Sequence, residues 1–158
     1  MRIVQLTDSY IEQTKDFMQL CWNDTYRNIL EQGFINRFLE QAYSTERLKI
    51  RLKLPFYLVL EEENIVGMAN FSYPNENGEV NLYAIYVHPQ YKGVGIGSRL
   101  LNEGIQNLQP TKILLEVEKE NLQAIKFYEN KKFVKIEEFK EELFGYELNT
   151  IRMKKDVQ

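Results

Sequence analysis

The sequence predicts an α/β fold in which a mixed β-sheet is flanked by helices. Three features support this prediction. The first third shows helical periodicity, the middle contains strand-like runs joined by short polar turns, and the last part alternates helices with strands. No repeat, low-complexity segment or linker interrupts the chain, so we expect one domain over residues 1–158.

The N-terminal third begins with a short strand at residues 2–6. Asp8 or Ser9 can cap a following helix that runs to about Cys21. A second helical region covers about residues 30–52. We expect it to break at the letters YSTE, where a serine or threonine can cap a fresh helix.

Three strands of an antiparallel meander are expected next, at residues 56–62, 65–73 and 79–87. A helix at 97–108 then leads to a strand at 112–118, which should form a right-handed crossover to a parallel strand. The strand at 112–118 is a continuous apolar run, which is typical of a strand buried on both faces.

A helix capped by Asn121 and two further strands complete the predicted fold. The helix carries the apolar residues Leu122, Ile125 and Phe127, and the strands have the sequences VKIEEFK and YELNTIRMKK. The sheet should therefore mix antiparallel and parallel pairs.

Composition and charge exclude several classes of function. The chain is 44% hydrophobic and 27% charged, as in ordinary globular proteins. Its 20 basic and 23 acidic residues give a net charge of −3 without a basic stripe, so we expect no nucleic-acid partner. No apolar run approaches the roughly 20 residues that span a bilayer, and the N-terminus lacks a signal-peptide pattern. We therefore expect a cytoplasmic protein that binds no membrane.

Cys21 and His88 are each the single residue of their type. One cysteine excludes an internal disulfide and a cysteine-based zinc site, and Cys21 is interpreted as a small core residue. One histidine leaves neither a histidine-pair metal site nor the usual Ser-His-Asp triad. We therefore expect no metal.

The glycines Gly93, Gly95 and Gly97 stand where the strand at 79–87 gives way to a helix, within the letters YKGVGIGSRLL. Without side chains, successive backbone N–H groups can point at an anion. The first helical turn adds unpaired amides and a partial positive charge. The pattern predicts a phosphate cradle, with a purely structural turn as the alternative.

Two known kinds of phosphate loop fit poorly. A nucleotide-triphosphate loop requires G-x-x-x-x-G-K-[ST], and no lysine follows the last glycine here. A dinucleotide fingerprint could be read as Gly93, Gly95 and Ser98, with Glu116 or Glu118 as the ribose-binding acid. Such a loop normally follows the first strand of repeated βαβ units, whereas this one follows a meander.

The stretch AIYVHPQYKGVGIGSRLL resembles the core motif of the GNAT family of acetyl-CoA-dependent N-acetyltransferases, in which a strand ending L-Y-V-x-P precedes [R/Q]-x-x-G-x-[G/A] and a helix. The matching residues are Lys92, Gly95 and Gly97, and lysine replacing arginine or glutamine leaves the role of that side chain open. The stretch NLQAIKFYENKKF resembles N-x-x-A-x-x-[F/L]-Y-x-x-x-G-F, with Lys132 in the glycine position. The resemblance covers essentially the whole chain and implies the GNAT fold, with two splayed parallel strands.

The resemblance implies acetyl-CoA as cosubstrate. Its pyrophosphate is expected on the backbone amides of Lys92, Gly93, Val94, Gly95, Ile96, Gly97 and Ser98. Its pantetheine arm is expected to pair like an extra strand with the backbone of Ile85, Tyr86 and Val87, in the gap between the splayed strands. The amide of Val87 is expected to polarise the thioester carbonyl.

By the same resemblance, Tyr128 donates a proton to the CoA thiolate, for which a phenol with a pKa of about 10 is suitably protonated. The alternative is a tyrosine packed in a helix. Asn121 aligns with an asparagine that hydrogen-bonds the cofactor, and helix capping is compatible with that role. Asn81 stands where many members have a glutamate, so no base is assigned. The remaining candidates for a water relay are Glu79, Tyr83 and Glu116.

The segments CWNDTYRNILEQGF and FLEQAYSTERLKIRL are similar to the bacterial branch that acetylates spermidine and spermine. The resemblance implies a small-molecule amine substrate, and a cationic chain favours carboxylates and aromatic faces. The candidate contacts are Trp22, Asp24, Tyr26, Glu31 and Tyr83. The alternative is that Trp22 and Tyr26 are core residues and Asp24 caps a helix.

Other functions stay open at this point. One is acetylation of protein N-termini or of other small amines, and another is a non-catalytic regulator that binds acetyl-CoA. Members of the family often dimerise, so a homodimer is expected by analogy.

Overall fold

The structure is a computed structural model that describes residues 1–157, so Gln158, the last residue of the expected domain, lies outside it. The regular elements are, in chain order, β1 (Arg2–Gln5), a 3-10 turn (Asp8–Tyr10), α1 (Ile11–Tyr26), α2 (Gln32–Ala42), α3 (Thr45–Arg51), β2 (Phe56–Glu61), β3 (Asn64–Phe71), β4 (Glu79–Val87), a second 3-10 turn (Pro89–Tyr91), α4 (Ile96–Leu108), β5 (Lys112–Glu118), α5 (Leu122–Asn130), β6 (Val134–Leu143) and β7 (Tyr146–Asp156).

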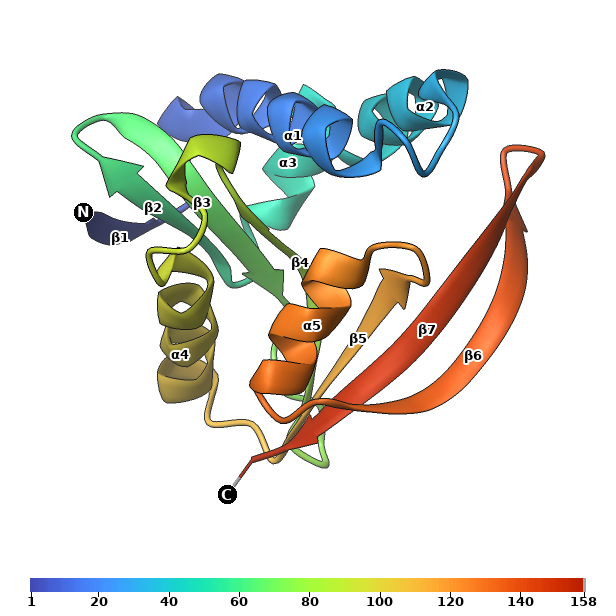
Figure 1. Ribbon diagram of the computed structural model, residues 1–158. Helices are drawn as coiled ribbons and strands as arrows, with labels where there is room; N and C mark the ends of the chain where they lie inside the picture. The colour runs from blue at the N-terminus through green and yellow to red at the C-terminus, as the bar shows by residue number, and fades with distance from the viewer. Residues whose placement is uncertain (158) are drawn as a thin grey trace.

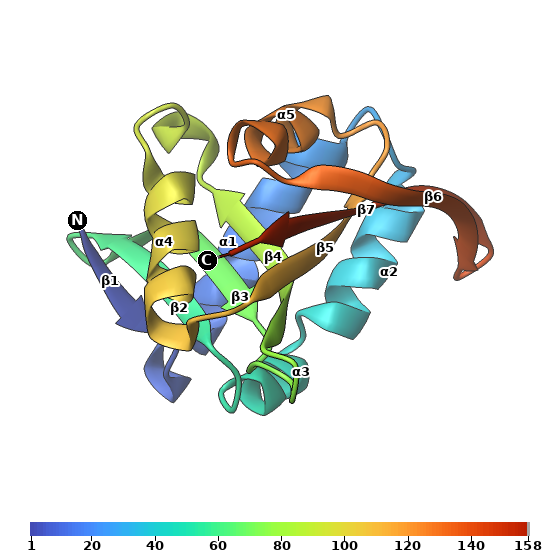
Figure 2. The same ribbon diagram turned by 90° about the horizontal axis from the view of Figure 1, so that it is seen from below.

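The predicted α/β fold with a mixed sheet is confirmed. Within residues 1–157, seven strands form one sheet in the order β1-β2-β3-β4-β5-β7-β6, in which only β4 and β5 pair in parallel. Helices α1 to α3 cover one face and α4 and α5 cover the other, as the two views in Figures 1 and 2 show. Two hydrophobic clusters, one beneath each helical layer, form the core.

Local sequence signals predicted most elements, and three expectations were wrong. The first helix was expected to run to about Cys21, whereas α1 continues to Tyr26. Ser44 caps α3 by accepting the amide of Arg47, as the YSTE letters predicted. The first cap was wrong: Asp8 and Ser9 lie in a 3-10 turn, and α1 begins later without a side-chain cap. The expectation for β5 was also wrong, because Glu116 is exposed and burial alternates along the strand.

Helix α4 lies close to the sheet because two glycines remove side chains at the contact. A Cβ on Gly104 would lie 2.3 Å from Cζ of Phe71 on β3, and a Cβ on Gly67 would lie 2.6 Å from Cγ2 of Ile96. The start of α4 is therefore held directly over β3, beside the end of β4.

The parallel strands β4 and β5 are splayed, as the family resemblance implied. They pair only from Glu79 to Asn81 on β4, opposite Lys112 to Leu114 on β5. Beyond this point the facing edges have no ladder between them. A wedge therefore opens inside the sheet and widens toward the loop that precedes α4.

The long β6–β7 hairpin bends toward the N-terminal helices (Figure 1). Its turn, Phe144-Gly145, has positive φ at both residues, as a type I′ turn requires. The Phe144 and Tyr146 rings lie 6.1 and 5.4 Å from the Phe34 ring of α2, and the guanidinium of Arg37 covers Phe144. These contacts join α2 to the tip of the hairpin. Among the described residues, no helix is both long and apolar enough to cross a bilayer.

Candidate active site

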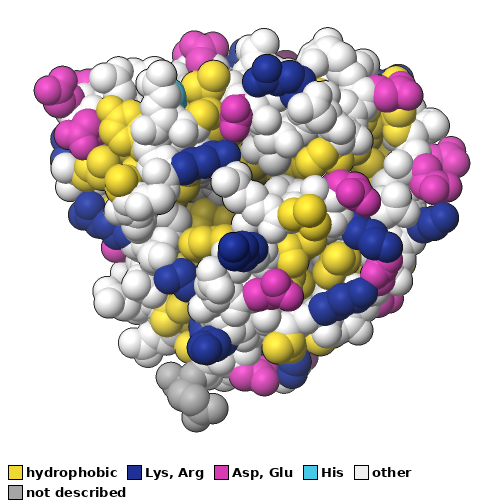
Figure 3. All heavy atoms as spheres, viewed as in Figure 1, with side chains coloured by type: hydrophobic (Ala, Val, Ile, Leu, Met, Phe, Trp, Pro, Cys, Tyr) yellow, Lys and Arg dark blue, Asp and Glu magenta, His cyan; other side chains and the backbone are white. Residues whose placement is uncertain are grey.

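A cavity of about 630 Å³ occupies the wedge between β4 and β5. Its wall is continued by α1, α2, α5, β6, β7 and the loop before α4. Figure 3 shows a hollow near the middle of the face seen in Figure 1, with hydrophobic side chains on its floor and Lys and Arg side chains around its margin. The cavity is large enough for a small-molecule ligand.

The loop before α4 presents free backbone amides to this cavity. Gly93 and Gly95 have φ values of 82° and 90°, and a Cβ on either would meet no atom within 4 Å. The amides of residues 93–98 donate to no acceptor within residues 1–157, and the first helical bond of α4 is Arg99 N–H to Gly95 O. Consecutive amides of this kind, together with the positive end of a helix, fit a phosphate group.

Gly97 has a different role from its two neighbours. It lies within α4, and a Cβ there would stand 3.1 Å from the Phe127 ring of α5. Its lack of a side chain therefore lets α4 and α5 approach across the wedge. The Val94 side chain is 66% exposed and does not line the cavity, whereas the Ile96 side chain is buried in the core.

The side chain of Lys92, whose role the sequence left open, bridges two helices. Its Nζ lies 3.3 Å from Asp24 Oδ2 of α1 and donates to Gln123 Oε1 of α5 at 3.1 Å. Asp24 also lies 4.0 Å from Arg27. Asp24 therefore stands at the margin and does not line the cavity.

The edge of β4 that faces the wedge carries the backbone groups of Ile85 and Val87. The amide of His88 donates to Val66 of β3, and alternation along the strand turns the Val87 and Ile85 amides the other way. The same alternation turns the backbone of Tyr86 toward β3. The backbone of Tyr86 is therefore not available to pair with the pantetheine arm, and only Ile85 and Val87 of the three predicted residues can do so.

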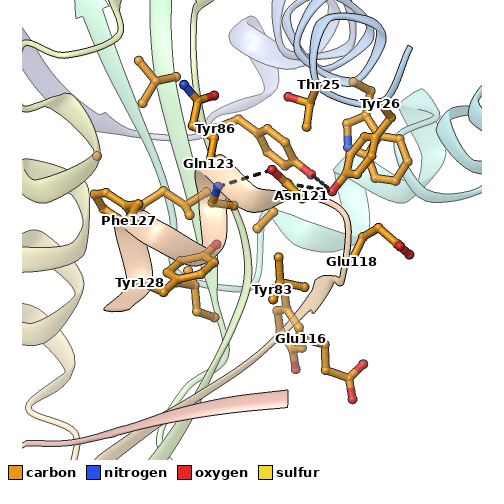
Figure 4. A pocket seen from close by; sticks show the side chains of 18 of the residues that line it. Thr25, Tyr26, Tyr83, Tyr86, Glu116, Glu118, Asn121, Gln123, Phe127 and Tyr128 are labelled. Carbon is orange, nitrogen blue, oxygen red and sulfur yellow. Dashed lines mark hydrogen bonds between the residues drawn. The ribbon is translucent and has the colours of Figure 1, made fainter. Parts of the chain in front are cut away.

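Tyr128 of α5 points into the cavity (Figure 4). Its side chain is 8% exposed, and its hydroxyl has no hydrogen-bond partner among the residues that the structure describes. Burial raises the pKa of Tyr128 well above the ordinary tyrosine value, with a smaller contribution from Tyr26. The hydroxyl is therefore protonated at neutral pH and free to donate a hydrogen bond.

A polar network lies beside Tyr128, at the end of β5 (Figure 4). The hydroxyls of Tyr26 and Tyr86 lie 3.3 Å apart, and Asn121 Nδ2 donates to Tyr26 at 3.5 Å. Asn121 Oδ1 accepts the amide of Ala124, which caps α5 as predicted. Burial is the main cause of the raised pKa values of Tyr26 and Tyr86.

One part of the cavity wall combines aromatic rings with carboxylates. We call this part, which carries Trp22, Tyr83, Glu116, Glu118 and Glu141, the far wall. Trp22 stacks on Phe38 at 4.2 Å, and its indole N–H has no acceptor within residues 1–157. Tyr83 of β4 lines the cavity and is 56% exposed. The carboxylates on the wall are Glu116, Glu118 and Glu141. Glu31 lies outside this lining.

Two carboxylates suggested by the sequence for a proton relay are already held by cations. Glu79 lies 3.7 Å from Lys112 and does not line the cavity. Glu116 accepts from Nε and Nη2 of Arg152 on β7. Each of these two carboxylates is thus already engaged by a basic side chain.

Sequence reasoning named Glu118 only as a possible ribose-binding acid of a dinucleotide site, and it missed the whole contribution of the hairpin to this cavity. Alternation along β5 could have indicated Glu118, because it shares a face with Glu116. No sequence signal placed Glu141, Leu148 and Thr150 on the cavity wall, since that depends on how the hairpin bends toward α2. Among residues 1–157, no cluster of three or more histidine, cysteine or acidic side chains could hold a metal.

Comparisons with known proteins place the fold and family. The model of the acetyltransferase (GNAT) family matches residues 16–133. The acetyltransferase PseH of Campylobacter jejuni is 29% identical over 117 residues, which cover 68% of this chain and 73% of that protein. The PaiA N-acetyltransferase of Thermoplasma acidophilum, solved with coenzyme A, has a TM-score of 0.81 at 19% identity, covering 99% of this chain and 98% of that one. YncA of Salmonella typhimurium, solved with acetyl-CoA, has a TM-score of 0.68 at 16% identity, covering 100% and 94%.

Proposed function

The chain belongs to the GNAT family of acetyltransferases, and from this membership we propose that it transfers the acetyl group of acetyl-CoA to a primary amine of a small molecule. The observation that carries the proposal is the run of free amides at residues 93–98, which opens onto the wedge that Tyr128 faces. An anion-binding loop, an unpaired strand edge and a buried hydroxyl thus meet in one cavity.

The chemistry of the described residues supports acetyl-CoA as the group bound in the wedge. The loop amides suit its pyrophosphate, and the wedge-facing backbone of Ile85 and Val87 can pair with its pantetheine amides. When bound, acetyl-CoA supplies an acyl group activated as a thioester. We expect the amide of Val87 to donate to the thioester carbonyl, as an oxyanion-hole donor does.

Tyr128 is the proposed proton donor for the departing thiolate. Its hydroxyl is protonated at neutral pH because burial raises its pKa, and no described side chain competes for its proton. The neighbouring Tyr26 hydroxyl is hydrogen-bonded to the Tyr86 hydroxyl and accepts from Asn121, and neither tyrosine is bonded to Tyr128. The donor is thereby kept available for a group that enters the cavity.

For the acceptor we propose a polyamine such as spermidine or spermine. The support is chemical: the far wall offers the Trp22 and Tyr83 rings and the carboxylates of Glu118 and Glu141, which suit a flexible cationic chain. The cytoplasmic location and the homodimer expected from the sequence and the resemblance belong to the same proposal.

Thiol release from acetyl-CoA tests the proposed function. We expect turnover above background hydrolysis with at least one amine from a panel of polyamines, aminoglycosides, amino acids and N-terminal peptides, and the highest kcat/KM with a polyamine. Better turnover of peptides would overturn the polyamine assignment and leave acetyl transfer intact. Binding of acetyl-CoA without release of thiol for any amine would instead favour a non-catalytic regulator.

A further inference from the structure

We propose that Glu118 is the general base that removes a proton from the acceptor's ammonium group before acetyl transfer. The proposal rests on the proposed function, because it assigns a role within the same cavity. The evidence for it is the set of contacts that the carboxylates on the cavity wall make within the described part of the chain.

Glu118 differs from the other carboxylates on the cavity wall in its contacts and in its position in the sheet. Glu116 is held by Arg152, and Glu141 is an exposed residue of β6, the outermost strand. Glu118 ends β5, the strand that borders the wedge, and it forms no ion pair within residues 1–157. Of the three carboxylates that the described residues place on the cavity wall, Glu118 is therefore the one that lies on a strand bordering the wedge and forms no ion pair.

The surroundings of Glu118 are nearly free of compensating positive charge. From α1 it faces the neutral hydroxyl of Tyr26, and on β7 its register partner is Thr150. The adjacent Lys119 is bound to Glu138 at 2.7 Å, and Lys92 is bound to Asp24 and Gln123.

The remaining groups near Glu118 are the Glu120 side chain and two backbone amides. Glu120 N–H lies 3.4 Å from Glu118 Oε1, and its carboxylate adds negative charge nearby. Desolvation by burial is the main cause of the raised pKa of Glu118, and the amides of Glu120 and Asn149 partly oppose it. A carboxylate that binds protons more readily is a better match for an ammonium group.

Acetyl transfer to an acceptor that binds as an ammonium ion requires a group that takes up a proton. An acceptor R–NH₃⁺ gives one proton to the Glu118 carboxylate and becomes R–NH₂. The amine lone pair forms the N–C bond while the C–S bond breaks and its electrons pass to sulfur. Sulfur takes the proton of the Tyr128 hydroxyl, the second nitrogen proton returns to the Tyr128 oxygen, and Glu118 releases its proton to water.

The test compares wild-type enzyme with Glu118→Gln and Glu118→Asp, using Glu120→Gln as the matched control. Glu120 is exposed, does not line the cavity and keeps its backbone contact to Glu118 when its side chain changes. The measurement is kcat/KM for the best amine of the panel against pH, with coenzyme A affinity and melting temperature as checks on folding.

We expect Glu118→Gln to lower kcat/KM at neutral pH by about 10²-fold or more, as loss of a general base does, with coenzyme A affinity unchanged. The variant can use only amine that is already neutral, so its log kcat/KM should rise by about one per pH unit below the amine pKa. The wild-type enzyme and Glu120→Gln should stay flat over the same range, and Glu118→Asp should recover part of the rate.

A Glu118→Gln profile that stays flat, or a rise in the amine KM with kcat unchanged, would overturn the proposal. Either result requires an active wild-type enzyme, so it differs from failure of the proposed function, in which the wild type itself transfers no acetyl group. A Glu118→Gln protein with an unchanged melting temperature and coenzyme A affinity excludes misfolding as the cause of a lost rate.

Discussion

At the scale of single residues, the proposed reaction depends on a hydroxyl that has no hydrogen-bond partner among the described residues. The buried Tyr128 side chain packs against the rings of Phe127 and Phe133, and its hydroxyl faces the cavity. Because burial raises its pKa, the phenol stays protonated through the neutral and mildly alkaline range. A loss of activity on the alkaline side should therefore not report the titration of Tyr128.

The first prediction concerns Tyr128→Phe, which removes the proposed donor and preserves the ring. We expect kcat to fall by about 10²-fold or more, the usual contribution of a positioned acid, with little change in coenzyme A affinity. Tyr73→Phe is the control, because Tyr73 is 57% exposed and lies outside the cavity. Steady-state kinetics and calorimetric titration make the comparison, and near-normal turnover of Tyr128→Phe would contradict the assignment.

A second prediction separates anion binding from backbone strain. Gly95 and Gly145 have φ values of 90° and 80°, and a Cβ on either meets nothing within 4 Å. Alanine at either position should cost about 1–2 kcal/mol of stability, because of the left-handed backbone.

Only Gly95→Ala should also weaken coenzyme A binding. An alanine at position 95 that leaves the left-handed region turns its N–H away from the phosphate. Loss of one charge-assisted hydrogen bond, about 1.5–3 kcal/mol, corresponds to about tenfold to a hundredfold in affinity. Urea unfolding measures the stability and calorimetry measures the affinity. Equal coenzyme A affinity in the two variants would argue against a phosphate at this loop.

At the scale of elements, the position of α4 over the sheet sets the position of the phosphate loop. Gly104 makes this contact possible, since the Phe71 ring beneath it is fully buried and has no room to move. Alanine is the better helix former by about 1 kcal/mol, but a Cβ at 2.3 Å from the ring outweighs that gain.

We expect Gly104→Ala to destabilise the protein by about 1–3 kcal/mol, and the double variant with Phe71→Leu to recover part of the loss. Thermal and urea unfolding give both values. A Gly104→Ala protein as stable as wild type would show that α4 does not lie this close to β3.

The elements differ in how far the sequence alone could predict them. The meander from β2 to β4 and the crossover to β5 followed from period-two alternation, short polar turns and the helical spacing after Gly97. The start of α1 could not be predicted in this way. Asp8 and Ser9 are residue types that often cap a helix, but here they lie in a 3-10 turn. Side-chain propensity alone does not choose between these two local structures.

The candidate site likewise contains residues that the sequence could predict and residues that it could not. The phosphate loop, Tyr128 and Asn121 are contiguous motifs, so their positions could be read from spacing. The far wall is assembled from α1, α2, β4, β5 and the β6–β7 hairpin, which come from different parts of the sequence. Glu141 belongs to the hairpin whose tip packs on α2, whereas β5 carries Glu118 to the same wall.

At the scale of the whole molecule, the sheet acts as two halves joined at one end. Strands β1 to β4 form one antiparallel half, and β5 to β7 form the other; the short β4–β5 ladder joins them. Helices α4 and α5 approach each other across the gap through Gly97 and Phe127, and Lys92 links α1 to α5 at its margin. This architecture leaves an opening inside the sheet whose walls come from both halves.

The most direct test of this account is a crystal structure of the protein with coenzyme A. We predict the pyrophosphate on the amides of residues 93–98, the pantetheine arm between β4 and β5 with its amides paired to Ile85 and Val87, and the sulfur within hydrogen-bonding reach of the Tyr128 hydroxyl. Coenzyme A bound outside the wedge, or with its sulfur remote from Tyr128, would contradict the central claim.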